Sequence, residues 1–207
     1  MEINSKKKIL FSIEPQNTNT TVGNPLLSTS VSKSSQYDSF FSTITFAEQP
    51  RSDSTIELIA MWFLHVSSMS NKKLQKMCYY AYCWFIVFFN VIELITEDNS
   101  NSIRVLSEER FQAWIHGPVS PRLYHRYKEY GWRDIPKSAF KPNLPDELET
   151  LLQQVWDAYG SFTADELEAI SHEEKPWKNA RKGINNGEAC ANEISNYDIL
   201  QYYSSLG

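Results

Sequence analysis

Residues 77–95 read MCYYAYCWFIVFFNVIELI, and every side chain of this run is apolar or aromatic until Asn90. From Leu74 onward the apolar residues also recur at intervals of three and four, which is typical of an α-helix. A membrane-spanning helix needs about 20 mainly apolar residues, whereas this run stops at Asn90, contains several tyrosines and is followed by Glu93. The sequence therefore predicts a central helix of a folded domain, buried by its neighbours and not inserted in a membrane.

Helix start signals lie on both sides of this run. Ser54 and Glu57 have the spacing of a capping box, and Ser70 is placed to begin the central helix. Further helices are expected from Pro145 to Tyr159, from Thr163 to about Glu173, over a turn or two within Pro176–Lys182, and from Ser195 onward. The predicted fold class is therefore mainly α, a compact helical domain with a small β-hairpin.

The hairpin is predicted from a change of period near Phe111. Alternate residues would face opposite sides of a strand, with one side formed by Phe111, Ala113 and Ile115 and the other by Gln112, Trp114 and His116. We expect the first side to join the core. Residues 103–106, Ile-Arg-Val-Leu, are the expected antiparallel partner, and Gly117-Pro118 is expected to end the strand.

A short helix with well-marked ends is expected directly after this strand. Ser120 is a good N-cap, and Pro121 suits the first helical position because its missing N–H would have no partner there. Gly131 stands where a C-terminal cap belongs. The sequence therefore predicts a helix from Pro121 to Tyr130.

The composition divides the chain into two parts, residues 1–52 and residues 53–207. Between Gln16 and Thr45 more than half of the positions are Ser, Thr or Asn, and such a segment buries too little apolar surface to offset the entropy of ordering it. Two strand-like patches interrupt it, at Ile9–Ile13 and Phe40–Phe46. We expect a low-complexity extension, with a flexible tail favoured over a segment that orders on a partner.

Charge and cysteine content narrow the class of partner and the compartment. The 207 residues carry a net charge of −5, which provides no overall field that would attract nucleic acid. Three cysteines are an odd number for a disulfide framework, and the N-terminal sequence is a poor secretion signal. A cytoplasmic protein is therefore expected, with nucleic acid not its favoured partner.

The residues that catalysis or metal binding would need do not fall at suitable spacings. The four histidines lie in four different predicted elements, and Cys78 and Cys83 are five residues apart, which fits neither a helical zinc site nor a zinc knuckle. A Cys78–His116 nucleophilic pair is disfavoured because Cys78 is expected on an apolar face. No glycine-rich phosphate loop is present in the sequence. We therefore expect no enzymatic activity, no metal and no cofactor, although a hydrolase with a metal site assembled from distant residues remains an alternative.

The candidates for partner binding are polar and amphipathic residues of the two blocks Lys73–Ala81 and Phe111–Tyr124, of the helix that follows, and of the later run from His172 to Arg181. Tyr, Trp and Arg are the residue types enriched at binding hot spots. The candidates are Gln75, Lys76, Trp114, His116, Arg122, Tyr124, Arg126, Trp177 and Arg181. In the structural alternative, the tyrosines pack inward, the basic residues form a solvated face, and Trp177 only covers the core.

The same two blocks, followed by two later motifs, resemble the Panacea antitoxin family, which includes SocA-like and phage-associated proteins. The matching motifs are Lys73-Leu-Gln-Lys76 with Tyr79-Tyr-Ala81, the Phe111–Tyr124 block with Trp114 and Gly117-Pro-Val119, Tyr127-Lys-Glu-Tyr-Gly131, and the run from His172 to Arg181. They follow one another in the expected order within residues 54–205. The central helix is more apolar than is usual for the family, and residues 1–52 lie outside the resemblance.

The resemblance implies a mainly helical domain that acts as the antitoxin of a toxin–antitoxin system. Its partner would be a cognate protein toxin, neutralised by direct protein–protein binding without enzymatic activity. Two other functions stay open at this point. One is a proteolytic adaptor that presents the toxin to a protease, and the other is a nucleic-acid-binding or autoregulatory module. Homo-oligomerisation is also left open, and a shared fold does not imply a shared partner.

Overall fold

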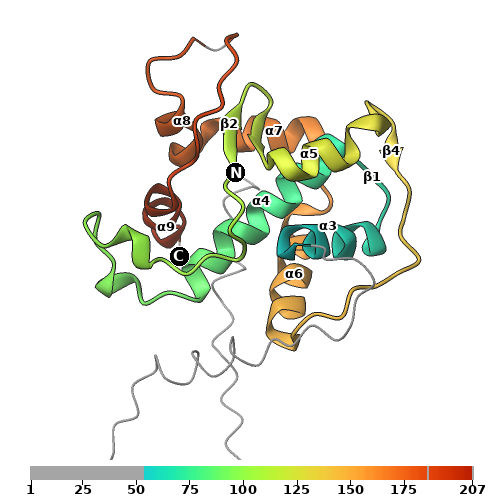
Figure 1. Ribbon diagram of the computed structural model, residues 1–207, viewed down its shortest axis with the longest axis horizontal. Helices are drawn as coiled ribbons and strands as arrows, with labels where there is room; N and C mark the ends of the chain where they lie inside the picture. The colour runs from blue at the N-terminus through green and yellow to red at the C-terminus, as the bar shows by residue number, and fades with distance from the viewer. Residues whose placement is uncertain (1–53, 186, 207) are drawn as a thin grey trace, which may run out of the picture.

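A computed structural model describes residues 54–185 and 187–206, and it has a mainly α fold (Figure 1). The expectations for residues 1–52, including docking of the two strand-like patches, lie outside these residues. The helices are α3 (Thr55–Val66), α4 (Asn71–Phe88), α5 (Pro121–Tyr127), α6 (Asp146–Tyr159), α7 (Ala164–Glu173), α8 (Lys175–Ala180) and α9 (Asn196–Ser204). Short 3-10 turns occupy Ile92–Leu94, Ser100–Ser102 and Lys128–Tyr130. The mainly helical fold class predicted from the sequence is confirmed.

Helix α4 runs through the middle of the molecule, with α9 on one side and α3 and α6 on the other (Figure 1). It begins at the predicted N-cap, where the Ser70 hydroxyl accepts a hydrogen bond from Lys73 N. The helix is buried from Leu74 to Val87, as its uninterrupted apolar run predicted. No helix in the described part of the chain combines the length and apolar character needed to cross a bilayer.

Neighbouring helices pack against the aromatic side chains of α4 and bind the polar atoms of Tyr82 and Trp84. The Tyr80 ring stacks on Tyr159 of α6 with 4.0 Å between ring centroids, and Trp84 Nε1 donates to the Tyr159 hydroxyl at 3.2 Å. On the other side, the Tyr82 hydroxyl donates to Asn196 Oδ1 at the start of α9. An amphipathic aromatic side chain is well suited to a core of this kind, because its ring packs while its polar atom finds a partner.

Two small antiparallel sheets complete the fold. Strands β1 (Met69–Ser70) and β4 (Asp134–Ile135) pair beside α3, while β2 (Gln112–Trp114) and β3 (Gly117–Val119) form the hairpin. The predicted partner of β2, residues 103–106, is wrong. Gly117-Pro118 begins the partner strand instead of ending the pairing, because Gly117 adopts φ +93 and turns the chain back. The other edge of β2 binds residues 192–194, where Ala113 N donates to Asn192 O and Ile194 N donates to Phe111 O.

The ends of the remaining helices agree closely with the sequence signals. Ser120 caps α5 and Pro121 is its first residue, but the helix ends at Tyr127 and continues only as a 3-10 turn to Gly131. The Thr163–Glu166 capping box opens α7, and Ser195 caps α9. Local capping chemistry therefore determines these boundaries independently of the tertiary contacts.

Candidate partner-binding site

Five of the nine predicted binding residues surround one pocket, which we call the hairpin pocket. Its volume is about 200 Å³, and it lies between the start of α4, the β2–β3 hairpin and α5. Its lining residues are Asn71, Lys72, Gln75, Lys76, Trp114, Ile115, His116, Val119, Tyr124 and Gly131. The two sequence blocks, about 30 residues apart in the chain, therefore meet in space and form one site.

Lys76 is the most deeply buried of these residues, with only 1% of its surface exposed. Its Nζ donates to Pro118 O in β3 at 3.1 Å. Burial in a medium of low polarity disfavours the charged ammonium and lowers the pKa of Lys76 to about 7. The sequence assigned Lys76 to the polar partner-binding candidates; the structure buries it under the hairpin, where it lines the pocket.

Gly117 allows the hairpin to pass directly over Lys76. A Cβ atom at position 117 would lie 2.7 Å from Lys76 Cε and 2.7 Å from Ser171 Oγ, and the backbone φ of +93 is one that side chains strongly disfavour. The glycine is therefore required both by the turn and by the close approach to the lysine. Because Gly117 belongs to the second sequence block and Lys76 to the first, this close approach joins the two blocks in space.

Gln75 is also buried, and it connects α4 to the beginning of α5. Its Oε1 accepts a hydrogen bond from Ser120 N at 2.9 Å, and its Nε2 donates to Asn71 Oδ1 at 3.3 Å. The Ser120 hydroxyl in turn accepts from Leu123 N. Gln75 thus acts as a buried positioning residue for the helix start and also lines the hairpin pocket.

The mouth of the hairpin pocket carries charged groups that pair with one another. His116 Nδ1 lies 3.1 Å from Glu168 Oε1 in α7, and Lys72 forms ion pairs with both Glu168 and Asp165. Burial alone would raise the pKa of Glu168, but its hydrogen bonds with Lys72 and His116 outweigh that effect and hold the pKa below its ordinary value. Glu168 is therefore a carboxylate already paired with Lys72 and in hydrogen-bond contact with His116.

Large apolar and aromatic side chains are exposed among the residues that line this pocket or directly beside them in the sequence. Trp114 is half-buried and packs edge-on against Tyr124, with 4.9 Å between the ring centroids. Tyr124 and Ile115 are 38% and 37% exposed, and Trp132, next to the lining residue Gly131, is 91% exposed. We call Ile115, Tyr124 and Trp132 the aromatic rim.

Two residues of this rim differ from the sequence predictions. Ile115 was assigned to the core from its alternation with Phe111 and Ala113. It is exposed because the hairpin turns directly after it. Trp132 was not among the predicted binding residues. The signal that could have found it was its position after the helix-ending Gly131, outside any apolar period.

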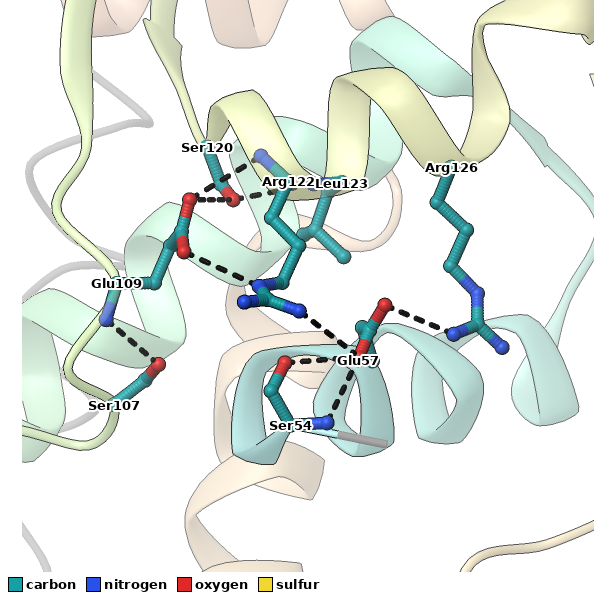
Figure 2. A network of polar contacts seen from close by, with 8 residues as sticks. All are labelled: Ser54, Glu57, Ser107, Glu109, Ser120, Arg122, Leu123 and Arg126. Carbon is teal, nitrogen blue, oxygen red and sulfur yellow. Dashed lines mark hydrogen bonds and ion pairs between the residues drawn. The ribbon is translucent and has the colours of Figure 1, made fainter. Parts of the chain in front are cut away.

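Arg122 and Arg126 lie on the side of α5 away from the hairpin pocket, and they hold that helix against α3 (Figure 2). Arg126 donates to Glu57 Oε1 at 2.9 Å, and Arg122 contacts both Glu57 and Glu109. Burial opposes ionisation of Glu57, but Ser54 N and Arg126 donate to its carboxylate and keep its pKa below the ordinary value. Glu109 also accepts hydrogen bonds from the Ser120 hydroxyl and Arg122 N. Both arginines are thus occupied by carboxylates.

Trp177 and Arg181 of the last motif are buried and fasten α8 to strand β2. Trp177 Nε1 donates to Trp114 O at 3.1 Å, and Arg181 NH1 donates to Ala113 O at 2.9 Å. Arg181 NH2 reaches Asn185 O and Glu188 O and so also holds the loop after α8. Both side chains are buried and neither lines the hairpin pocket, and their assignment as partner contacts stays a prediction. They support the hairpin from behind.

These contacts bear on the other functions considered from the sequence. The nucleic-acid interpretation rests on Arg122, Arg126, Lys128 and Arg181. Arg122 and Arg126 are ion-paired and Arg181 is buried, whereas Lys128 is exposed. Burial raises the pKa of the Cys78 thiol, which disfavours the nucleophilic thiolate. Within residues 54–185 and 187–206, no three His, Cys, Asp or Glu side chains gather in a way that could hold a metal ion.

Comparison with known proteins gives one match. No curated protein and no solved structure is similar enough to match the chain. A family model, described as Antitoxin SocA-like, Panacea domain, matches residues 99–178. This segment contains the second block, the whole hairpin and most of the last motif, whereas the first block at Lys73–Ala81 precedes it. Residues 99–178 are therefore similar to the SocA-like Panacea antitoxin domain, the family that the ordered motifs of the sequence resemble.

Proposed function

We propose that this chain neutralises a cognate protein toxin by direct contact, without a chemical reaction, and that the aromatic rim and the hairpin pocket form the contact surface. The antitoxin-domain match supports a role in a toxin–antitoxin system. The observation that carries the surface assignment is the exposure of Ile115, Tyr124 and Trp132 beside a concave, mainly apolar pocket. Large exposed aromatic residues around a pocket are characteristic of protein-binding hot spots.

The interaction is expected in the cytoplasm. Cys78, Cys83 and Cys190 are all free thiols in this structure, which agrees with a reducing compartment. The toxin would be a small protein encoded beside this chain, as is implied by its antitoxin domain. The contact surface would bind it without help from a cofactor.

Co-expression tests the proposal. The neighbouring small open reading frame should arrest growth when expressed alone and become harmless when this chain is expressed with it. The two proteins should also co-purify. If no neighbouring product is toxic, or if toxicity persists despite soluble expression of this chain, the antitoxin function is wrong.

A surface variant tests the location of the contact. Trp132→Ser should raise the amount of antitoxin needed for growth about tenfold or more, because an aromatic hot spot is worth about 2 kcal/mol or more. Phe140→Ser is the matched control, since Phe140 is 49% exposed and follows Ser138, whose N–H donates to Leu64 O near the end of α3, whereas Trp132 directly follows the lining residue Gly131. Equal neutralisation by wild type and Trp132→Ser would place the contact elsewhere.

The same strains separate direct neutralisation from the adaptor function. Under direct neutralisation, the toxin should remain at a constant level while growth recovers. An adaptor would instead cause the toxin to disappear after synthesis is stopped, and this loss would depend on a host protease. Immunoblots of the toxin over time distinguish the two mechanisms.

A further inference from the structure

Lys76 is a buried cation without a carboxylate partner among the residues that the structure describes. Its ammonium donates to a backbone carbonyl, Pro118 O, whereas nearby Lys72 pairs with Glu168 and Asp165. Burying a charge without a counter-ion is costly, because the loss of hydration is not compensated by a carbonyl dipole alone. A single added carboxylate would therefore gain more here than at an exposed lysine.

Several charged and titratable groups surround this ammonium. Lys72 lies on the same helix, Glu168 and His172 lie on α7, and His116 lies on the hairpin. The Glu168 carboxylate attracts Lys76 at a distance but is already shared by Lys72 and His116. Lys72 repels it, and burial lowers the pKa of His172, which favours its neutral form. Counted together, these groups leave the positive charge of Lys76 uncompensated.

The hairpin pocket offers a route by which a negative group can approach. Lys76 lines this pocket together with Lys72 and His116, and its other walls include Trp114, Ile115, Val119 and Tyr124. A volume of about 200 Å³ is below the range of about 300–1,000 Å³ typical of sites for drug-sized molecules. The pocket is suited to one side chain with a short apolar stem and a charged end.

We propose that the hairpin pocket binds one acidic side chain, Asp or Glu, of the partner protein, and that Lys76 supplies the buried counter-charge with Lys72 and His116 at the mouth. That the acidic side chain belongs to a partner protein rests on the antitoxin function proposed above. The apolar walls would contact the methylene groups of the side chain, and the aromatic rim would surround it and exclude water. An acidic anchor of this type would give the surface specificity as well as contact area.

Blocked amino acids test the chemistry of the pocket without any toxin. N-acetyl-glutamate-N-methylamide and its glutamine counterpart differ only in the carboxylate. In NMR titrations of the full chain at pH 6.5, the glutamate probe should shift the amides of residues 114–119 and bind about tenfold tighter than the glutamine probe. Equal affinity for the two probes, or shifts that map away from the hairpin, would overturn the proposal.

Variants of Lys76 assign the counter-charge. Lys76→Met should remove the preference for the glutamate probe, whereas Lys73→Met, on the same helix but outside the pocket, should keep it. Amide spectra of both variants show directly whether the fold is retained. Should Lys76→Met fail to fold, the wild-type comparison of the two probes still decides the proposal.

The pH dependence provides a second readout. Because the pKa of free Lys76 is about 7, affinity for the glutamate probe should fall about 20-fold between pH 6.5 and pH 8.5 in wild type. It should change little in Lys76→Met. A pH dependence that persists in Lys76→Met would assign the titration to another group and contradict the role given to Lys76.

Failure of this inference is distinguishable from failure of the antitoxin function. If co-expression shows neutralisation but the two probes bind equally, the pocket does not recognise an acidic side chain and the antitoxin proposal stands. If the glutamate probe binds selectively but no neighbouring product is toxic, the pocket chemistry stands and its partner is a different protein. Two independent measurements therefore decide the two claims.

Discussion

Lys76 is the residue at which sequence and environment conflict most strongly. A lysine in a helix is normally an exposed, solvated residue, but here Gly117 lies over it and Ser171 lies beside the same turn. Its position links the two sequence blocks more directly than any apolar contact. Two predictions concern this pair of residues.

The first prediction concerns the pH dependence of stability. The pKa of Lys76 is about 7 in the folded protein because burial disfavours its charge, and about 10.4 in an unfolded chain. Between these values the unfolded chain binds more protons, so stability rises with pH. From pH 7 to pH 9, the unfolding free energy of wild type should rise by about 2 kcal/mol relative to that of Lys76→Met.

Urea denaturation at both pH values measures this difference. The matched control is Lys182→Met, because Lys182 is exposed. Its unfolding free energy should follow wild type across the same range. If the unfolding free energies of wild type and Lys76→Met change equally with pH, the lowered pKa of buried Lys76 is contradicted.

The second prediction concerns Gly117. Gly117→Ala would add a Cβ 2.7 Å from two buried side chains, Lys76 and Ser171, at a position with φ +93. Gly183 also has positive φ, but a Cβ there would meet no atom within 4 Å. Both variants share the backbone strain, so Gly117→Ala should be less stable than Gly183→Ala by about 2 kcal/mol. Thermal or urea denaturation measures the difference, and equal losses would argue against the close packing.

At the scale of elements, α5 is held by two different interactions on its two sides. Its Arg122 and Arg126 bind the carboxylates of Glu57 and Glu109 (Figure 2), while Tyr124 packs on Trp114 beside the hairpin pocket. The ion-pair side fixes the helix so that the other side can present its aromatic residue. Arginines that the sequence suggested as partner contacts therefore act through the position of Tyr124.

The third prediction tests this connection through Glu57. Glu57→Gln removes the charge that pairs with Arg126 and weakens the α3 capping box, so it should cost about 1–2 kcal/mol at pH 7. The pKa of Glu57 is lowered in the folded state, so its stabilisation is present above about pH 4.5 and is lost as pH falls through the folded-state pKa. The variant should therefore lose less stability than wild type on acidification.

Denaturant midpoints at pH 7 and pH 3 measure both effects. The control is Glu147→Gln, an exposed first-turn residue of α6, which should cost only about 0.5 kcal/mol. If Glu57→Gln and Glu147→Gln behave alike, the network does not hold α5 against α3.

The hairpin is held in a comparable way by α8 and by the segment at residues 192–194. Arg181 donates to Ala113 O and to two carbonyls of the following loop. A lysine lacks the planar fork needed to reach all three acceptors. Loss of these bonds should therefore loosen β2 before it disturbs the rest of the core.

The fourth prediction follows from this arrangement. Arg181→Lys should destabilise the protein by about 2–3 kcal/mol and speed hydrogen exchange at Ala113 and Ile194, whose amides bridge β2 and residues 192–194. Exchange in the centre of α4 should rise only as global stability falls. Lys182→Met, at the next and exposed position, should leave exchange at both amides unchanged; similar effects of the two variants would contradict the anchoring role.

At the scale of the whole molecule, the described residues form seven helices, with α4 at the centre. The antitoxin-domain match covers residues 99–178, which include the hairpin. The first block, on α4, contributes buried support to a site whose exposed part belongs to the second block. The site is thus incomplete without both. A fragment limited to the matched segment would lack the helix on which the hairpin rests.

The fifth prediction concerns the division at residue 52. A chain beginning at residue 53 should keep the helical circular dichroism and unfolding cooperativity of the full chain, because residues 54–185 and 187–206 pack around a continuous apolar core of their own. Neutralisation should be unchanged if residues 1–52 are a flexible tail and should be lost if they order on the toxin. Loss of cooperative unfolding itself would contradict the domain boundary.

Sequence by itself determined the elements whose signals are local. The capping residues Ser54, Ser70, Ser120 and Thr163 placed four helix starts correctly, because an N-cap bonds only to the next turn of its own chain. The long apolar run identified the central helix for a similar reason. A helix that is apolar on every face is buried on every face, whichever neighbouring elements cover it.

Tertiary structure decided which strand pairs with β2, and which polar residues face water. Pairing depends on the turn at Gly117 and on residues 192–194 from the other end of the chain, and a period of two does not specify a partner. Residue type likewise predicts exposure only on average: Lys76, Gln75 and Arg181 are buried because backbone carbonyls or a backbone amide from the hairpin region bind them, while Ile115 is exposed at the turn. Such partners are distant in sequence, so only the folded chain brings them together.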